Sequence, residues 1–264
     1  FQDTPECTPE KCPYAKGHFD RVNDAVYELW TTEEVYSREV IRAHAEKWQV
    51  CPFEMCLDLS IWVDGIICDY NYVFDPNVHL KRFFGENISG DHIFLIDEAH
   101  NLVERGREMY SAGISRQSLV ALRKKIRKRF SKLARALDKA NRQMMELEEN
   151  LAETGKGYQV LPNPGVLPIT FLTISGELEE ILEEKELEEE LRREILEFYF
   201  IVRDFLNVSE LVDENYVVYT ENSAEEGFRL MLFCVNPAEN LGEYLKKGKS
   251  AIFFSATMLS LIHI

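Results

Sequence analysis

The 264-residue sequence lacks several features that mark common protein classes. It has no run of about 18 uncharged apolar residues, so no membrane-spanning helix is predicted. No apolar stretch follows the polar start FQDTPECTPEK, so no secretory signal peptide is visible, and we expect a cytoplasmic protein. The chain also begins without Met, and we therefore expect that an upstream part is missing.

Positive charge is also scarce. The 30 Lys and Arg against 46 Asp and Glu give a net charge of -16, which by itself argues against a nucleic-acid partner. The charge is unevenly spread, however, because residues 116–142 are strongly basic and residues 177–197 strongly acidic. The total therefore hides a basic segment.

Hydrophobic residues make up 45% of the chain, enough for one good core or two small ones. Four of the six cysteines lie in the first 56 residues, unlike an even scatter of buried structural thiols. Without a secretory signal, this grouping favours metal ligation over disulfides.

The first part of the chain, residues 1–60, is predicted to be mostly helical, with apolar residues at helical spacing in 12–30 and a second helix at 37–49. Residues 66–68 predict a short buried strand and Asp75-Pro76 a turn. A helix at 78–84 is expected before the next strand, so a parallel sheet is favoured. Cys68 and Cys234 lie in apolar strand segments and are expected to be buried.

The basic segment predicts a long helix from about 116 to 150, with apolar residues three and four apart. After a Gly- and Pro-rich break, a second helix is predicted over about 175–206. Two long helices of opposite charge suggest an antiparallel hairpin inserted into an α/β domain. Residues 216–221, 228–235 and 250–257 predict strands that would rejoin the parallel sheet.

The segment HIFLIDEAHNL, residues 92–102, has the clearest chemical pattern. Residues 93–96 predict a fully buried parallel strand that ends in Asp97 and Glu98. Strands of this kind end at the crevice where α/β proteins bind ligands, so both carboxylates are predicted to face a ligand. In isolation, IDEAH fits equally well a strand end with a helix-capping carboxylate.

The ordered set of segments resembles superfamily 2 DNA helicases of the XPD/DinG type: a cysteine-rich helical module, IICDYNYVFDP, FLIDEAHNL, a long helical insertion and IFFSATM. The resemblance extends to about Met258. It implies an α/β fold, a partial parallel-sheet RecA-like motor domain with helical iron–sulfur and arch insertions. The parts would be the iron–sulfur region 1–60, the DEAH part of the motor 61–115, the arch-like insertion 116–224 and the return to the motor 225–258.

The family's motifs imply roles for individual residues. By resemblance, Asp97 holds the Mg²⁺ of ATP, usually through a water, and Glu98 orients and deprotonates the water that attacks the γ-phosphate. His100 would couple the nucleotide state to a SAT motif at the end of the adjoining strand, which consists of Ser255, Ala256 and Thr257. The resemblance thus implies an ATP-dependent DNA helicase in DNA repair, moving 5′ to 3′, with single-stranded and forked DNA as partners.

The family also carries a 4Fe–4S cluster held by four thiolates in the cysteine-rich region. Cys7, Cys12 and Cys51 match three of these ligands, and the fourth is expected upstream of the first residue. Cys56 is the internal alternative, although on a helix it would point to another face than Cys51. A Cys-x4-Cys pair fits zinc as well.

The basic helix has two interpretations. Basic residues on a long helix usually form a solvated face, and here they would be able to pair with the acidic helix. In the family, this insertion is the arch that helps enclose the translocating strand. By resemblance, the candidates for phosphate contact are Arg123, Lys124, Arg127 and Lys128.

A helicase of this type needs a P-loop, G-x-x-x-x-G-K-S/T, and the sequence contains none. GEYLKKGKS, residues 242–250, has five residues instead of four between its glycines and precedes a strand, so we interpret it as a turn. The P-loop is expected upstream of the first residue. LSLIHI, residues 259–264, departs from the family and matches a translated sequencing adapter, so a non-native tail is predicted.

Two other function classes stay open. A metal-bearing nucleic-acid-binding module without catalysis is compatible with the missing P-loop. An acidic coiled-coil adaptor explains the helical hairpin but leaves DEAH, SAT and the cysteines as coincidence. The leading hypothesis implies ATP, Mg²⁺ and a 4Fe–4S cluster as cofactors and no membrane partner.

Overall fold

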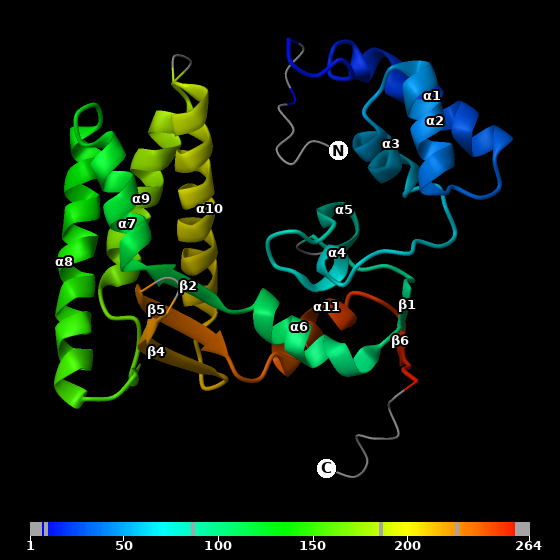
Figure 1. Cartoon of the computed structure of the whole chain (residues 1–264). Coiled ribbons are helices and arrows are strands. Elements are labelled where there is room, and N and C mark those ends of the chain that lie inside the picture. Colours follow the sequence, from blue (N-terminus) through cyan, green and yellow to red (C-terminus); the bar gives the residue numbers. More distant parts are fainter. Residues whose placement is uncertain (1–6, 8–9, 86–87, 185–186, 225–226, 257–264) are drawn as a thin grey trace. The chain divides into compact units, whose positions relative to one another are not determined.

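The computed structural model describes residues 7, 10–85, 88–184, 187–224 and 227–256. The chain divides into two compact units, Phe1–Cys68 and Asp69–Ile264 (Figure 1). Across the described ranges, no helix has both the length and the apolar character needed to cross a bilayer.

The first unit is helical. It contains α1 (His18–Thr32), α2 (Arg38–Trp48) and α3 (Pro52–Leu59). The Ser37 side chain caps α2 by accepting a hydrogen bond from the Val40 N–H, and Pro52 begins α3, where a missing N–H costs nothing. The three helices enclose a small core of Val22, Ala25, Val26, Leu29, Ala45, Val50, Met55 and Leu59. Both helices predicted in this region are confirmed.

The second unit contains a pair of parallel strands with short helices around it. Its elements are α4 (Asn71–Phe74), α5 (Lys81–Phe84), β1 (Ile93–Ile96), the 3-10 turn η1 (Ala99–Asn101), α6 (Leu102–Met109), α11 (Ala238–Leu245) and β6 (Ser250–Phe253). Strands β1 and β6 pair in parallel, with Ile93 opposite Ser250 and Ile96 opposite Phe253. The predicted α/β class with a parallel sheet is confirmed.

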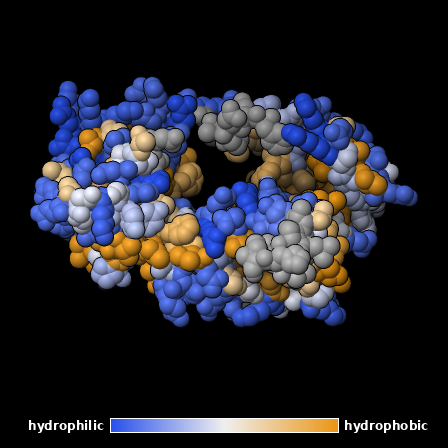
Figure 2. All heavy atoms as spheres, turned by 60° about the horizontal axis from the view of Figure 1, so that its bottom comes forward, coloured by the Kyte–Doolittle hydropathy of each residue, from blue (hydrophilic) through white to orange (hydrophobic). Residues whose placement is uncertain are grey.

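Strand β1 is buried on one face only. Phe94 and Ile96 point into the core, whereas Leu95 is 67% exposed, so the prediction of full burial is wrong. Ile252, opposite Leu95 in the register, is exposed as well. In the described part of the chain, elements cover only one side of this strand pair. Figure 2 shows hydrophobic areas among hydrophilic ones on one face of the molecule.

The segment before β1 also differs from the prediction. Residues 66–68 form no strand, Ile67 is fully exposed and Cys68 is exposed too. A short apolar segment becomes a strand only beside another strand, and the described sheet pairs β1 with β6 alone. The helix expected over 78–84 is limited to the single turn of α5.

The insertion contains more helices than predicted. They are α7 (Arg116–Ile126), α8 (Ser131–Thr154), α9 (Leu167–Leu182) and α10 (Glu189–Leu211). The predicted long helix breaks before Ser131, where Phe130 has a non-helical backbone with φ -119° and ψ 79°. The apolar residues on both sides of the break are buried, because α7 and α8 pack on each other. The predicted hairpin of two helices is therefore wrong.

The strands of the insertion form their own sheet. β2 (Ala112–Ser115), β3 (Tyr158–Leu161), β4 (Tyr216–Ser223) and β5 (Gly227–Cys234) are antiparallel in the order β2-β5-β4-β3. The predicted strands at 216–221 and 228–235 exist, but they do not rejoin the parallel sheet. Burial alternates along both, as expected for an antiparallel hairpin with one covered face. Strands β2 and β5 of this sheet thus lie outside 116–224, the range predicted for the insertion.

Candidate functional site

The ends of β1 and β6 form one hydrogen-bonded unit. Beyond the strand pairing, the Phe254 N–H donates to the Ile96 carbonyl at 3.0 Å, and the Ala99 N–H donates to the Phe254 carbonyl at 3.1 Å. The chain then turns through η1 directly into α6. The DEAH residues are therefore held against the SAT segment by backbone bonds as well as by side chains.

Three side chains meet at this point. The Ser255 hydroxyl donates to Glu98 Oε2 at 2.9 Å, and His100 Nδ1 lies 2.7 Å from Ser255 Oγ. His100 Nδ1 also lies 3.1 Å from Glu98 Oε2. The DEAH carboxylate, the DEAH histidine and the SAT serine thus form a closed triangle between residues that are 155 and 157 positions apart.

The proton positions in this triangle follow from the number of donors. An ionised Glu98 only accepts hydrogen bonds, so the single Ser255 proton points to the carboxylate. Ser255 Oγ then accepts from His100, which requires a proton on His100 Nδ1. The histidine is therefore either the neutral Nδ1–H tautomer or the imidazolium, and in both forms it donates toward the serine and the carboxylate.

The turn that follows β1 has an unusual backbone. Glu98 has φ 47° and ψ 43°, in the left-handed region that residues with a Cβ rarely adopt. Asp97 Oδ1 accepts from the Glu98 N–H at 2.8 Å. The Tyr70 hydroxyl donates to the carbonyl oxygens of Asp97 and Glu98. Tyr70 was not among the residues predicted to belong to the site.

Both carboxylates remain accessible. Asp97 is exposed, the Glu98 side chain is 51% exposed and the His100 side chain 32%. A ligand can therefore reach the two carboxylates while His100 is partly covered. Ala256 continues the chain from Ser255 and is exposed, and Thr257, the last residue of the predicted SAT motif, lies outside the described residues.

The segment 242–250 does not form a phosphate loop. Its first half belongs to α11, and only the part after Leu245 is the turn that we predicted. The backbone N–H groups of residues 246–248 donate to carbonyls of the preceding turn, and that of Lys249 donates to His92. Lys247 Nζ donates to the Gly85 carbonyl at 2.8 Å. These donors are used within the fold, so they form no cradle for a phosphate.

The cysteines do not assemble into a metal centre. Cys7 and Cys56 are exposed, Cys12 and Cys51 are partly exposed, and Cys51 precedes α3 as its N-cap. Nowhere in the described ranges do three or more His, Cys, Asp or Glu come close enough to hold a metal ion. The residues present therefore do not fit a cluster by themselves, and no step below passes through one. Cys234 is buried, as predicted, whereas Cys68 is not.

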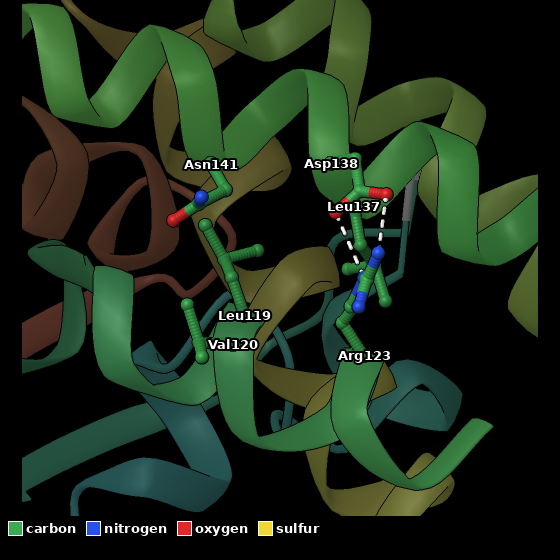
Figure 3. A pocket seen from close by; sticks show the side chains of 6 residues that line it. All are labelled: Leu119, Val120, Arg123, Leu137, Asp138 and Asn141. Carbon is green, nitrogen blue, oxygen red and sulfur yellow. Dashed lines mark hydrogen bonds and ion pairs between the residues drawn. The ribbon is translucent and has the colours of Figure 1, made fainter. Parts of the chain in front are cut away.

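The four basic candidates for DNA contact differ in their surroundings. Arg123 forms an ion pair with Asp138 and lines a pocket of about 300 Å³ between α7 and α8 (Figure 3). The other lining residues are Leu119, Val120, Leu137, Asp138 and Asn141. Lys124, Arg127 and Lys128 are exposed, and no described residue forms an ion pair with them.

Other cations of the basic segment do pair with the acidic one. Lys125 contacts Glu194 of α10, and Arg129 lies 3.1 Å from Glu184. Arg116 forms an ion pair at 2.8 Å with Glu148 of α8, one of the two helices that contain the basic segment. The pairing interpretation therefore holds for part of the basic segment, and phosphate contact by the exposed residues stays a prediction.

Comparison with known proteins identifies relatives. The DEAD_2 family model matches residues 2–119. The Fanconi anemia group J protein homolog of Gallus gallus is 25% identical over 180 residues, 61% of this chain and 14% of that protein. The general transcription and DNA repair factor IIH helicase subunit XPD/RAD3 of Saccharomyces cerevisiae is 30% identical over 102 residues, 39% of this chain and 12% of that protein. The chain thus spans about one seventh or less of the length of these relatives.

Proposed function

Because the chain is related to XPD-type superfamily 2 helicases through the DEAD_2 region, we propose that it forms part of the ATP-hydrolysing motor of a DNA helicase. The observation that supports this most directly is the triangle of Glu98, His100 and Ser255. It joins the ends of two parallel strands, the usual place for a ligand site in α/β proteins. A strand end with only a capping carboxylate would not need a histidine and a distant serine on the same oxygen.

Glu98 is the proposed general base. Ser255 and His100 both contact Oε2, which leaves Oε1 to accept a proton from the water that attacks the γ-phosphate. In phosphoryl transfer the protein contributes mainly positioning and charge stabilisation, so the fixed direction of this carboxylate matters more than its basicity. Its partial exposure allows nucleotide and water to enter.

Asp97 is the proposed partner of the magnesium ion that accompanies ATP. A magnesium ion in such sites is usually held by one or two carboxylates, the substrate phosphates and several waters. Asp97 is exposed next to Glu98, and the Glu98 N–H donates to its Oδ1. One carboxylate in a fixed orientation fits this kind of binding. When bound, the ion would supply positive charge that offsets the negative charge of the ATP phosphates.

His100 and Ser255 are the proposed coupling residues. Any change at Glu98 on nucleotide binding or hydrolysis alters the shared hydrogen bonds, and through Ser255 it reaches β6 and the chain beyond it. By family resemblance this movement drives 5′ to 3′ translocation on single-stranded DNA and unwinding of forked DNA. Ala256 and Thr257 would complete the motif.

The two insertions complete the proposal. The four helices α7 to α10 with their antiparallel sheet correspond to the arch, and the exposed Lys124, Arg127 and Lys128 are its proposed phosphate contacts. The iron–sulfur cluster on Cys7, Cys12 and Cys51 rests on the sequence pattern and the family alone.

Glu98→Gln tests the proposal in the full-length protein. The amide keeps the size of the side chain but cannot accept a proton, so DNA-stimulated ATP hydrolysis should fall by about 100-fold or more while ATP binding persists. Nucleotide binding is measured with a fluorescent ATP analogue and hydrolysis by phosphate release. Glu104→Gln, at an exposed carboxylate of α6, is the matched control and should behave as wild type. Near-normal turnover in Glu98→Gln would contradict the role of Glu98.

A further inference from the structure

Tyr70 links a remote segment to the backbone of the DEAH turn. It precedes α4 directly, 27 and 28 positions before the two residues whose carbonyl oxygens it contacts. Its hydroxyl donates to the Asp97 carbonyl and lies 3.1 Å from the Glu98 carbonyl. The ring packs against the main hydrophobic core. The hydroxyl is therefore held in place by an anchored side chain.

These two carbonyls define the conformation of Glu98. The Asp97 carbonyl belongs to the peptide plane before Glu98, and the Glu98 carbonyl belongs to the plane after it. The relative orientation of the two planes sets φ and ψ of Glu98, which lie in the left-handed region at 47° and 43°. For a residue with a Cβ this conformation is strained, so something must stabilise it.

We propose that Tyr70 is a positioning residue that holds Glu98 in this left-handed conformation and so directs its carboxylate toward Ser255 and the attacking water. The inference rests on the proposed ATPase function and adds a residue to it. With the backbone of Glu98 turned to the usual right-handed region, the side chain would leave the β1 end in another direction. The contacts of Glu98 Oε2 with Ser255 and His100 would then be lost.

The Tyr70 hydroxyl carries a proton at neutral pH, so it can donate the hydrogen bond that this contact needs. Phenylalanine retains the packing of the ring and removes only this donor.

Tyr70→Phe in the full-length protein tests the inference. Loss of one hydrogen bond of this kind should lower kcat for ATP hydrolysis about three- to tenfold, with the KM for ATP and the binding of a fluorescent ATP analogue unchanged. Amide hydrogen exchange of residues 97–101, measured without nucleotide, should become faster, because the turn loses its anchor. Tyr72→Phe, which removes a hydroxyl from α4 itself, is the control and should match wild type in both measurements.

Each alternative result has a definite meaning. An unchanged kcat in Tyr70→Phe overturns the inference, and so does a lower kcat with unchanged amide exchange in the turn. A raised KM with an unchanged kcat assigns Tyr70 to nucleotide binding instead. If Glu98→Gln retains turnover, the ATPase proposal itself fails, and the exchange measurement still decides whether Tyr70 holds the turn.

Discussion

Arg123 binds Asp138 through two contacts, Nε to Oδ1 at 2.8 Å and Nη2 to Oδ2 at 3.0 Å, and so ties α7 to α8 (Figure 3). The hydrogen bond and charge of Asp138 raise the pKa of the Arg123 guanidinium. The Nη2 hydrogen bond and the Nε ion-pair contact together fix the orientation of both side chains. Arg123 is thus engaged in the insertion's own structure, unlike the exposed Lys124, Arg127 and Lys128.

We therefore expect mutation of Arg123 and mutation of the other three basic candidates to have different effects. Replacing Lys124, Arg127 and Lys128 together by Ala should weaken single-stranded DNA binding and lower the slope of log affinity against log salt by about 2, because up to three phosphate contacts are lost. The thermal unfolding midpoint should stay near that of wild type, since all three side chains are exposed. Fluorescence anisotropy with a labelled oligonucleotide across a salt series measures the slope.

Arg123→Ala is the matched control for that triple variant. It should lower the unfolding midpoint by breaking the contact between α7 and α8, and it should leave the salt slope unchanged. An unchanged slope in the triple variant would exclude these side chains from phosphate contact. A reduced slope in Arg123→Ala would show that the ion pair opens to bind DNA.

Local patterns predicted some elements well. Strand β1 and the turn after it follow from an apolar run that stops at two carboxylates. Helices α1 and α2 of the first unit follow from regular apolar spacing. For the helices the deciding interactions are between near neighbours in the chain, and such interactions are visible in a sequence. Strand β1 also needs its partner β6, which lies far along the chain.

Long-range pairing was harder to predict. The apolar spacing from Leu119 to Leu137 continues across the break at Phe130, so the pattern is the same for one helix or two packed ones. β4 and β5 alternate as a hairpin should, but their sheet is decided by the short strand β2 more than 100 residues away. Tyr70 was missed because its partners are backbone carbonyls, which every residue has.

A partly buried carboxyl group on α10, that of Asp204, should make stability depend on pH. Burial raises the pKa of Asp204, and nearby Asp75 raises it further, although Asn77 donates a hydrogen bond to Asp204 Oδ1 at 2.8 Å. Between the unfolded value of 3.8 and the higher folded pKa, the folded state binds more protons than the unfolded state. The contribution of this group to the free energy of unfolding is therefore completely present below pH 3.8, and it is lost as pH rises through the folded pKa.

Asp204→Asn should remove this loss of stability at higher pH. The amide stays neutral and its oxygen still accepts from Asn77, so the variant should be more stable than wild type at pH 7 and gain nothing below the unfolded pKa. Urea unfolding at a series of pH values measures the difference. Glu210→Gln, on the same helix but exposed, is the control. An advantage of Asp204→Asn that is equal at every pH would show that packing and not ionisation is responsible.

The spacing of the cysteines predicts a bound metal. If Cys7, Cys12 and Cys51 with one further cysteine hold a 4Fe–4S cluster, the full-length protein purified without oxygen should be brown and contain about four irons per chain. Cys51→Ser should remove most of this iron, whereas Cys234→Ser, at a buried thiol in β5, should retain it. Stoichiometric zinc without iron would instead support the zinc alternative.

The 264 residues alone should hydrolyse no ATP above background. In the proposed function, Asp97 and Glu98 act on a triphosphate that another element must hold, and in helicases of the proposed type that element is the P-loop, with its backbone amides and lysine. The sequence contains no such motif, and the amides of residues 246–249 are already bonded within the fold.

An ATPase assay of the purified 264-residue chain, with and without single-stranded DNA, tests this prediction, with Glu98→Gln measured in parallel. Weak DNA binding through the exposed basic residues should persist and fall steeply as salt rises, because released counterions drive it. Hydrolysis that DNA stimulates and that Glu98→Gln abolishes would contradict the prediction, because these residues would then contain a complete nucleotide site. The turn around Lys247 would be the first place to seek it, since opening its bond to the Gly85 carbonyl would free an ammonium group close to β6.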